Sequence, residues 1–411
     1  MIKICHATEA VPLLPESELL VWCARTVVPN KLKACIRQRA QESLDWPVLL
    51  NMARSHGVVP LLYRNLSTIA SDFVPTEALI RLRQLTQASA LLNQSLAQEL
   101  VVLCKAFTAG GVPVIPIKGA TLAVLAYGDL SLRDFTDLDL LIPEASIVEA
   151  QNILLVHGYE RKTSAEEPSE RNQEEGPHHV YIKKRGLSRV DLQWVMADRH
   201  FAFRLDRSEV WRRRIPVAFE NHTIEGLAPE DLLIVLCVHG SKHAWEHLKW
   251  VCDVAELLHA HPVLDWKQCF ASASDWRCRR MLSMGLFLAH RLLDAPLPQI
   301  VLERLKEDSD VQSLSRRMPA SLLANSQDGI SEEQATVLYF ALKDSWWERW
   351  CFGLMLCRAH SHLATTPPPW FRWRTSLRRL ANIIIPAHRV LKFLLSPAIR
   401  SAVNRWVPHV G

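Results

Sequence analysis

The 411-residue sequence has no apolar run long enough to cross a membrane. A membrane-spanning helix needs roughly 18–20 consecutive apolar residues. The longest candidates are Leu232–Val238, which is too short, and Ile383–Leu395, which Pro386 and Arg389 interrupt. The start of the chain also lacks the apolar core of a signal peptide. We therefore expect a cytoplasmic protein.

Closely spaced cysteine pairs are absent as well. The sequence has 10 cysteines, but none of them forms a CxxC pair, and no spacing supports a zinc site. In a cytoplasmic chain we expect these cysteines to be reduced thiols rather than a disulfide framework. The chain has no repeat of fixed period and no low-complexity segment. Its 49% hydrophobic content excludes a wholly disordered or fibrous protein.

The net charge of +5 is unevenly distributed. Residues 346–411 contain ten Lys and Arg residues and one acid, so the rest of the chain is mildly acidic. Within this segment, residues 367–411 mix basic and aromatic side chains. Such a segment is typical of three situations: contact with an anionic membrane surface, packing as helices on the main body, or contact with nucleic acid. We favour the membrane surface, at the inner face.

Hydrophobic periodicity predicts an α+β fold with a small mixed sheet between two helical regions. Short β-rich or alternating runs at 113–117, 137–142, 178–183 and 189–195 predict the strands. The segments before Gly110 have helical spacing, and a further helical stretch runs from Pro229 to Leu258. The expected divisions are an N-terminal helical region (1–110), a sheet-containing core (111–200), a C-terminal helical domain (201–345) and a basic, Trp-rich tail (346–411).

The first chemical signal is Lys118-Gly119, which lies between a predicted strand and a short predicted helix over Gly119–Tyr127. The N-terminus of a helix offers free N–H groups to an anion. Glycine permits close approach of a phosphate to the backbone, and Lys118 adds a positive charge. The pattern indicates a phosphate site, but Lys-Gly pairs are common and the signal alone is weak.

The second signal is a group of carboxylates on neighbouring strands. Asp137 and Asp139 are two residues apart, so their side chains point to one face of a strand. Asp191 occupies a similar position on a later strand. Isolated Asp-x-Asp pairs are usually only turn or cap residues. Three carboxylates after a strand–Lys-Gly–helix unit are instead typical of a Mg²⁺ or Mn²⁺ site for phosphoryl chemistry.

With these motifs the chain resembles the nucleotidyltransferase superfamily that includes DNA polymerase β. Within it, the chain is most similar to a family of uncharacterised bacterial nucleotidyltransferase-like proteins. The resemblance covers about Asp45–Leu258. The motifs that carry it are Asp45-Trp46, His56-Gly57, Lys118-Gly119, Arg133, Asp137-Leu-Asp139, Gly158-Tyr159, Asp191-Leu-Gln-Trp194 and the segment from His239 to Asp253.

The resemblance implies a nucleotidyltransferase core that moves a nucleoside monophosphate from a nucleoside triphosphate to a hydroxyl. Asp137 and Asp139 would hold Mg²⁺ against the triphosphate, and Asp191 would complete a second metal site. Lys118 and Arg133 would bind phosphate oxygens, with Gly119 beside them. The acceptor is open: a small molecule, a glycan precursor, a protein side chain or an RNA end.

Two departures from the family pattern affect these expectations. Lys118-Gly119 stands where the wider superfamily usually has Gly-Ser, and Gln193 stands where the family usually has His. Because Gln193 cannot act as a base and the tail is basic, a non-catalytic nucleotide-binding or membrane-surface adaptor remains an alternative. A phosphotransferase at the same cleft is a related enzyme alternative.

A histidine pair follows in the C-terminal helical domain. His239 and His243 are four residues apart and so share one helix face. This spacing is compatible with polar contacts at the cleft, with ordinary packing and with a metal pair, and we favour the first. We therefore expect His239, Lys242 and His243 to lie on the nucleotide side of the cleft, where Lys249 either reaches a phosphate or faces solvent.

Overall fold

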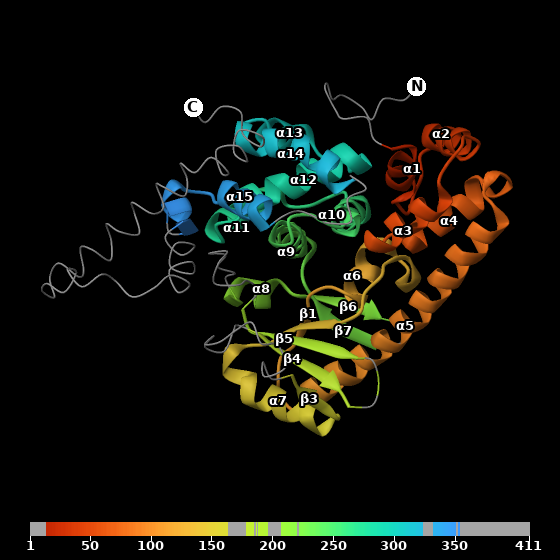
Figure 1. The fold of residues 1–411 in the computed structure, drawn as a ribbon. Helices are drawn as coiled ribbons and strands as arrows, with labels where there is room; N and C mark the ends of the chain where they lie inside the picture. The colour runs from red at the N-terminus through yellow and green to blue at the C-terminus, as the bar shows by residue number, and fades with distance from the viewer. Residues whose placement is uncertain are drawn as a thin grey trace, which may run out of the picture.

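The computed structural model describes residues 14–162, 178–184, 186, 188–195, 207–219, 222–323, 332–350 and 352–353. A helical part lies over a sheet, and the long helix α5 runs along one side from the helices to the sheet (Figure 1). The predicted α+β class with a small mixed sheet is confirmed. The segment 367–411, for which a membrane contact is expected, lies outside the described residues.

The helices before the sheet follow the capping signals of the sequence. Asp45 caps α3, where its side chain accepts a 2.9 Å hydrogen bond from the Val48 N–H. Gly57 follows α3 with a φ of +65°, a conformation that favours glycine. The bounds are α1 (Pro15–Cys23), α2 (Asn30–Ala40), α3 (Trp46–Ser55), α4 (Val59–Ile69), the 3₁₀ helix η1 (Ser71–Phe73) and the 34-residue α5 (Thr76–Ala109).

The main sheet has the strand order β1-β2-β5-β4-β3. Strands β2 and β5 are parallel, whereas every other pair is antiparallel. Strand β3 was not predicted, because three residues directly after Gly158 give no alternation. The bounds are β1 (Ile115–Pro116), α6 (Ala120–Leu122), the π-helical turn η2 (Ala123–Tyr127), η3 (Leu130–Leu132), β2 (Leu138–Leu141), η4 (Glu144–Ser146), α7 (Ile147–Val156), β3 (Tyr159–Arg161), β4 (His178–Lys183) and β5 (Arg189–Gln193).

The region after the main sheet contains a hairpin that the sequence analysis missed, inside the expected helical domain. The helical stretch predicted from Pro229 to Leu258 divides into α9 and α10. The bounds are α8 (Arg207–Arg213), β6 (Ile215–Phe219), β7 (His222–Gly226), α9 (Pro229–Lys242), α10 (Leu248–Ala260), α11 (Trp266–Asp275), α12 (Arg279–Leu293), α13 (Gln299–Leu305), α14 (Ser309–Leu322) and α15 (Glu332–Ala341).

The buried apolar side chains form two clusters. One contains residues of the helices that precede and follow the sheet in the chain, such as Leu19 of α1 and Leu258 of α10, together with Ile115 and Leu141 of the sheet. The other lies around the sheet, where residues such as Phe107 of α5 pack against Leu140 of β2 and its neighbours. The first and last helical regions thus share one core, and most of the buried sheet residues belong to the second. Within the described residues, no helix is long and apolar enough to cross a membrane.

Candidate active site

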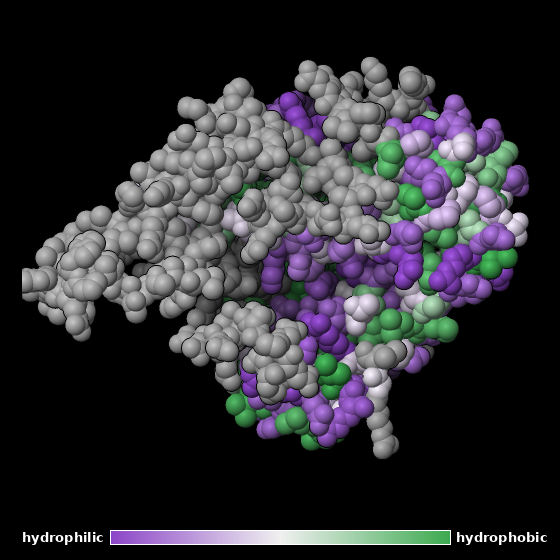
Figure 2. Space-filling model, in the orientation of Figure 1, coloured by the Kyte–Doolittle hydropathy of each residue, from purple (hydrophilic) through white to green (hydrophobic). Residues whose placement is uncertain are grey.

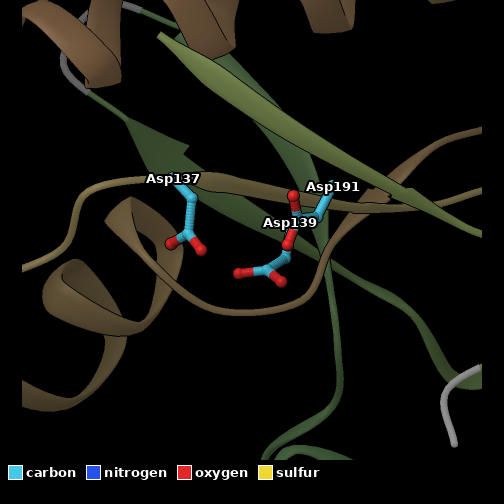
Figure 3. Close-up of side chains that lie close together, drawn as sticks. All are labelled: Asp137, Asp139 and Asp191. Carbon is cyan, nitrogen blue, oxygen red and sulfur yellow. The ribbon is translucent and has the colours of Figure 1, made fainter. Parts of the chain in front are cut away.

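Three carboxylates meet where β2 and β5 run side by side (Figure 3). Their oxygens lie within 4.8 Å of one another, in Asp137, Asp139 and Asp191. Asp137 directly precedes β2, and Asp139 is the register partner of Asp191 across the parallel pair. The prediction that these side chains lie together is confirmed, while their catalytic roles stay predictions.

Alternation along the two strands explains why these side chains converge. Leu138 and Leu140 are 2% and 0% exposed and fill the sheet cluster on the opposite side. Val190 and Leu192 do the same from β5. Because successive side chains of a strand point to opposite faces, burial of these four residues fixes the direction of the carboxylates.

Asp139 lies at the centre of the cluster and is only 3% exposed. Its Oδ2 lies 2.6 Å from the Nζ of Lys118, and its Oδ1 accepts a 3.1 Å hydrogen bond from the side-chain amide of Gln193. Burial raises the pKa of Asp139, Lys118 opposes that rise, and the charges of Asp137 and Asp191 add to it. The carboxylates therefore repel one another in spite of Lys118, and a further cation would remove that repulsion.

Lys118 and Asp191 each form an ion pair within the site, Lys118 with Asp139 and Asp191 with Arg189. Burial favours the neutral form of Lys118, but Asp139 and Asp137 outweigh it and raise the lysine pKa, so Lys118 is charged. Asp191 accepts two hydrogen bonds from Arg189, of 2.8 and 3.1 Å. Arg189 is half exposed, so this pair is weak and can open.

Gly119 keeps the chain close to the carboxylates. Its φ is +68°, and a Cβ on it would lie 3.4 Å from the backbone oxygen of Asp137. The neighbouring Ile117 N–H donates a 3.0 Å hydrogen bond to the backbone oxygen of Asp139. The helix expected after Gly119 is only α6, with three residues, followed by the π-helical turn η2. The helix dipole therefore adds little here, and Lys118 carries the positive charge.

Arg133 is held by an aspartate that the sequence analysis did not single out. Its guanidinium donates hydrogen bonds of 2.7 and 2.8 Å to the two carboxylate oxygens of Asp253 in α10. Tyr127 donates a third, of 2.7 Å, to the same carboxylate. Arg133 and Asp253 are 5% and 1% exposed, so the pair is buried. The predicted contact of Arg133 with phosphate stays a prediction, and the observed contact ties the segment before β2 to α10.

The break between α9 and α10 brings the histidines beside this site. Trp245 is fully buried with a φ of +55°, and a Cβ on Gly240 would lie 2.5 Å from its ring. A side chain at position 240 would therefore collide with the buried indole, and the chain turns at Trp245 between α9 and α10. His239 and His243 lie 4.7 Å apart between ring centroids, which confirms their predicted shared face.

Both histidines are neutral at neutral pH. Burial lowers the pKa of each, His243 to about 4, and the positive charges of Lys242 and Lys118 contribute. Their rings pack around Trp250, at 5.6 Å for His239 and 5.0 Å for His243. His239 and His243 therefore lie within electrostatic reach of both Lys118 and Lys242, on the helical side of the carboxylates. In the orientation of Figure 1, hydrophilic residues gather between the helical part and the sheet (Figure 2).

A third histidine, at the contact between the end of α3 and the start of α10, makes the stability of the fold depend on pH. His56 is 7% exposed, and its Nδ1 accepts a 3.3 Å hydrogen bond from the Leu248 N–H. Burial, reinforced by His247, lowers its pKa to about 4. Below a pH of about 6.5 the unfolded chain binds a proton at this residue before the folded chain does, so acid destabilises the fold.

The free energy of unfolding is therefore expected to fall as the pH drops from about 6.5 to about 4. His56 alone contributes a slope of up to about 1.4 kcal/mol per pH unit in this window. The variant His56→Gln keeps an acceptor but cannot titrate, and it is expected to show a shallower slope. Urea denaturation at several pH values measures both proteins, and equal slopes would contradict the assignment.

Comparison with known proteins supplies the family. Residues 42–294 match a family described as uncharacterised nucleotidyltransferase, which is more than half of the chain. The chain belongs to this nucleotidyltransferase family. The match contains the carboxylate cluster, Lys118, Arg133 with Asp253, and the histidine pair. The family is one of transferases, so nucleotidyl transfer is the general activity that it assigns.

A solved structure is also similar to this nucleotidyltransferase. It is the crystal structure of an antigenic nucleotidyltransferase-like protein from Paracoccidioides brasiliensis, with 14% sequence identity and a TM-score of 0.30. The similarity covers 52% of this chain and 96% of the other. No curated protein matches the chain.

Proposed function

We propose that the protein transfers a nucleoside monophosphate from a nucleoside triphosphate to a hydroxyl acceptor and releases pyrophosphate. The observation that carries this proposal is the cluster of Asp137, Asp139 and Asp191, with oxygens within 4.8 Å. The donor set consists of hard carboxylate oxygens, which suits Mg²⁺ or Mn²⁺. Burial, reinforced by the charges of Asp137 and Asp191, raises the pKa of Asp139, and this supports the same fit.

The residues of the chain then have distinct tasks. A divalent cation held by the three carboxylates would neutralise charge on the triphosphate and increase the acidity of the acceptor hydroxyl. Gln193 keeps Asp139 oriented through the 3.1 Å hydrogen bond to its Oδ1. Once the ion pair with Arg189 has opened, Asp191 helps to activate the attacking hydroxyl. The hydroxyl oxygen bonds to the α-phosphorus as the bond to the bridging oxygen breaks, and pyrophosphate leaves with the electron pair.

The nucleotide-binding side of the site is assigned to the cationic and polar residues around Lys118. Lys118 shifts from Asp139 to phosphate oxygens when the triphosphate arrives. Gly119 allows the phosphates to approach the backbone. Arg133, Lys242, His239 and His243 are the further residues that we assign to this side. The acceptor is open among a small molecule, a glycan precursor, a protein side chain and an RNA end.

A second candidate is a nucleotide-binding adaptor without turnover. The observation in its favour is that Asp139 already has a counter-ion in Lys118, at 2.6 Å, and an amide partner in Gln193. In this version the protein is cytoplasmic and attaches to an anionic membrane surface through residues 367–411. Vesicle binding that is sensitive to salt, lost on deletion of residues 367–411 and unaffected by Asp137→Asn/Asp139→Asn would support it.

Labelled nucleotides distinguish transfer of a nucleotide from transfer of a phosphate. The protein is incubated with Mg²⁺, a cell extract as the source of acceptors, and ATP, GTP, CTP or UTP labelled at either the α- or the γ-phosphate. The proposal predicts α-label on an acceptor and γ-label in pyrophosphate, both lost in Asp137→Asn/Asp139→Asn. The γ-label on the acceptor would instead identify a phosphotransferase and contradict the proposal.

A further inference from the structure

Lys249, in the first turn of α10, is held in place by the corner that follows α3. Its N–H donates a 3.1 Å hydrogen bond to the backbone oxygen of His56. Its side-chain stem lies against Gly57, where an added Cβ would be only 2.7 Å from the lysine Cδ. Gly57 has a φ of +65°, so both its conformation and this contact favour glycine. The stem of Lys249 is therefore positioned before any ligand binds.

The two carboxylates that act electrostatically on Lys249 already have hydrogen-bond donors. Asp253 lies one helical turn further along α10, but Arg133 and Tyr127 occupy its oxygens. Asp134 accepts a hydrogen bond from the hydroxyl of Ser89. Within the part of the chain that the structure describes, no ion pair involves Lys249. The charge of this half-buried ammonium is therefore offset only in part by Asp253 and Asp134, neither of which forms an ion pair with it.

Two other cations, Arg133 and Lys118, act on this ammonium. Burial and then Arg133 lower the pKa of Lys249, Lys118 contributes in the same direction, and Asp253 and Asp134 oppose them. Lys118 belongs to the strand side of the site and Lys249 to the helical side. An anion with several charges that lies between them would relieve the repulsion of both at once.

We propose that Lys249 binds the β- and γ-phosphates of the nucleoside triphosphate, that is, the pyrophosphate that leaves. The inference rests on the proposed function, because it places the α-phosphate at the carboxylates and the remaining phosphates towards α10. Besides its assigned nucleotide-binding role, Arg133 also positions Lys249, since its ion pair with Asp253 fixes the turn of α10 that follows Lys249. A residue of the helical part, Lys249 of α10, then binds the substrate directly.

Inorganic pyrophosphate is the probe that isolates this contact. Calorimetric titrations in the presence of Mg²⁺ compare the wild type with Lys249→Gln, Lys249→Arg and the control Lys267→Gln, an exposed lysine on α11. Loss of the charged contact is expected to weaken pyrophosphate and nucleoside triphosphate binding by about 10- to 100-fold. Lys249→Arg is expected to retain most of the affinity, and Lys267→Gln all of it. Binding of the nucleoside monophosphate is expected to change less than about twofold in all variants.

The outcomes separate this inference from the function on which it rests. If Lys249→Gln binds pyrophosphate as tightly as the wild type, while Asp137→Asn/Asp139→Asn has lost metal-dependent nucleotide binding, the role of Lys249 is refuted and the function stands. If Lys249→Gln weakens monophosphate binding as much as pyrophosphate binding, Lys249 has only a structural role and the inference is also refuted. If the folded wild type binds neither pyrophosphate nor a triphosphate, the proposed function itself is contradicted.

Discussion

Replacing Asp139 by Asn is expected to lower the rate of nucleotidyl transfer by about a thousandfold, which corresponds to about 4 kcal/mol of transition-state stabilisation. Asp139 is the buried member of the cluster and contacts both Lys118 and Gln193. Asparagine has nearly the same volume but lacks the charge that would hold a divalent cation. The measurement is the initial rate of pyrophosphate release at saturating nucleotide.

The variant should remain folded, because it removes a carboxylate whose raised pKa reflects its costly burial, and Asp137 still offers a negative charge to Lys118. A matched control is Asp275→Asn at the exposed end of α11, which removes an equal charge away from the cluster and should leave the rate unchanged. Full activity of a folded Asp139→Asn protein would exclude the carboxylate cluster as the catalytic centre.

Arg133→Met is expected to destabilise the protein by about 3–5 kcal/mol, because it leaves Asp253 buried without its partner. Both side chains of this pair are almost inaccessible to solvent, and Arg133 donates a hydrogen bond to each carboxylate oxygen of Asp253. The free energy of unfolding from urea denaturation measures the effect. The double variant Arg133→Met/Asp253→Leu removes both charges and should recover much of the loss.

The exposed pair of Arg189 and Asp191 supplies the comparison. Arg189 is half exposed, so Arg189→Met should change the free energy of unfolding by no more than about 1 kcal/mol. A loss in Arg133→Met as small as in Arg189→Met would mean that the Arg133–Asp253 pair does not hold the segment before β2 against α10.

The sequence predicts the carboxylate site because its geometry is local. Alternation along β2 fixes the faces of Asp137 and Asp139, and the same period along β5 fixes Asp191. The capping residue Asp45 and the end of α3 at Gly57 are also visible in the sequence, for the same reason. The parallel pairing of β2 with β5 cannot be obtained from either strand alone.

The parts that escaped prediction depend on contacts between residues far apart in the chain. Arg133 and Asp253 are 120 positions apart, so nothing in either segment shows that they pair. The α9–α10 break depends on the fit of Trp245, which lies between the two helices, against Gly240 of α9 and Gly285 of α12. A sequence signal for Asp253 existed, since it ends the motif that starts at His239, but its partner could not be identified from spacing.

Binding of a non-hydrolysable nucleotide tests the central claim most directly, because it needs no acceptor. Calorimetry would compare α,β-methylene analogues of the four nucleoside triphosphates, with and without Mg²⁺, on the wild type and on Asp137→Asn/Asp139→Asn. The account predicts that the wild type binds at least one analogue only with Mg²⁺, and that the folded variant has lost this binding. Binding of equal strength in both proteins, or binding that is indifferent to Mg²⁺, would show that the three carboxylates are not a metal–nucleotide site.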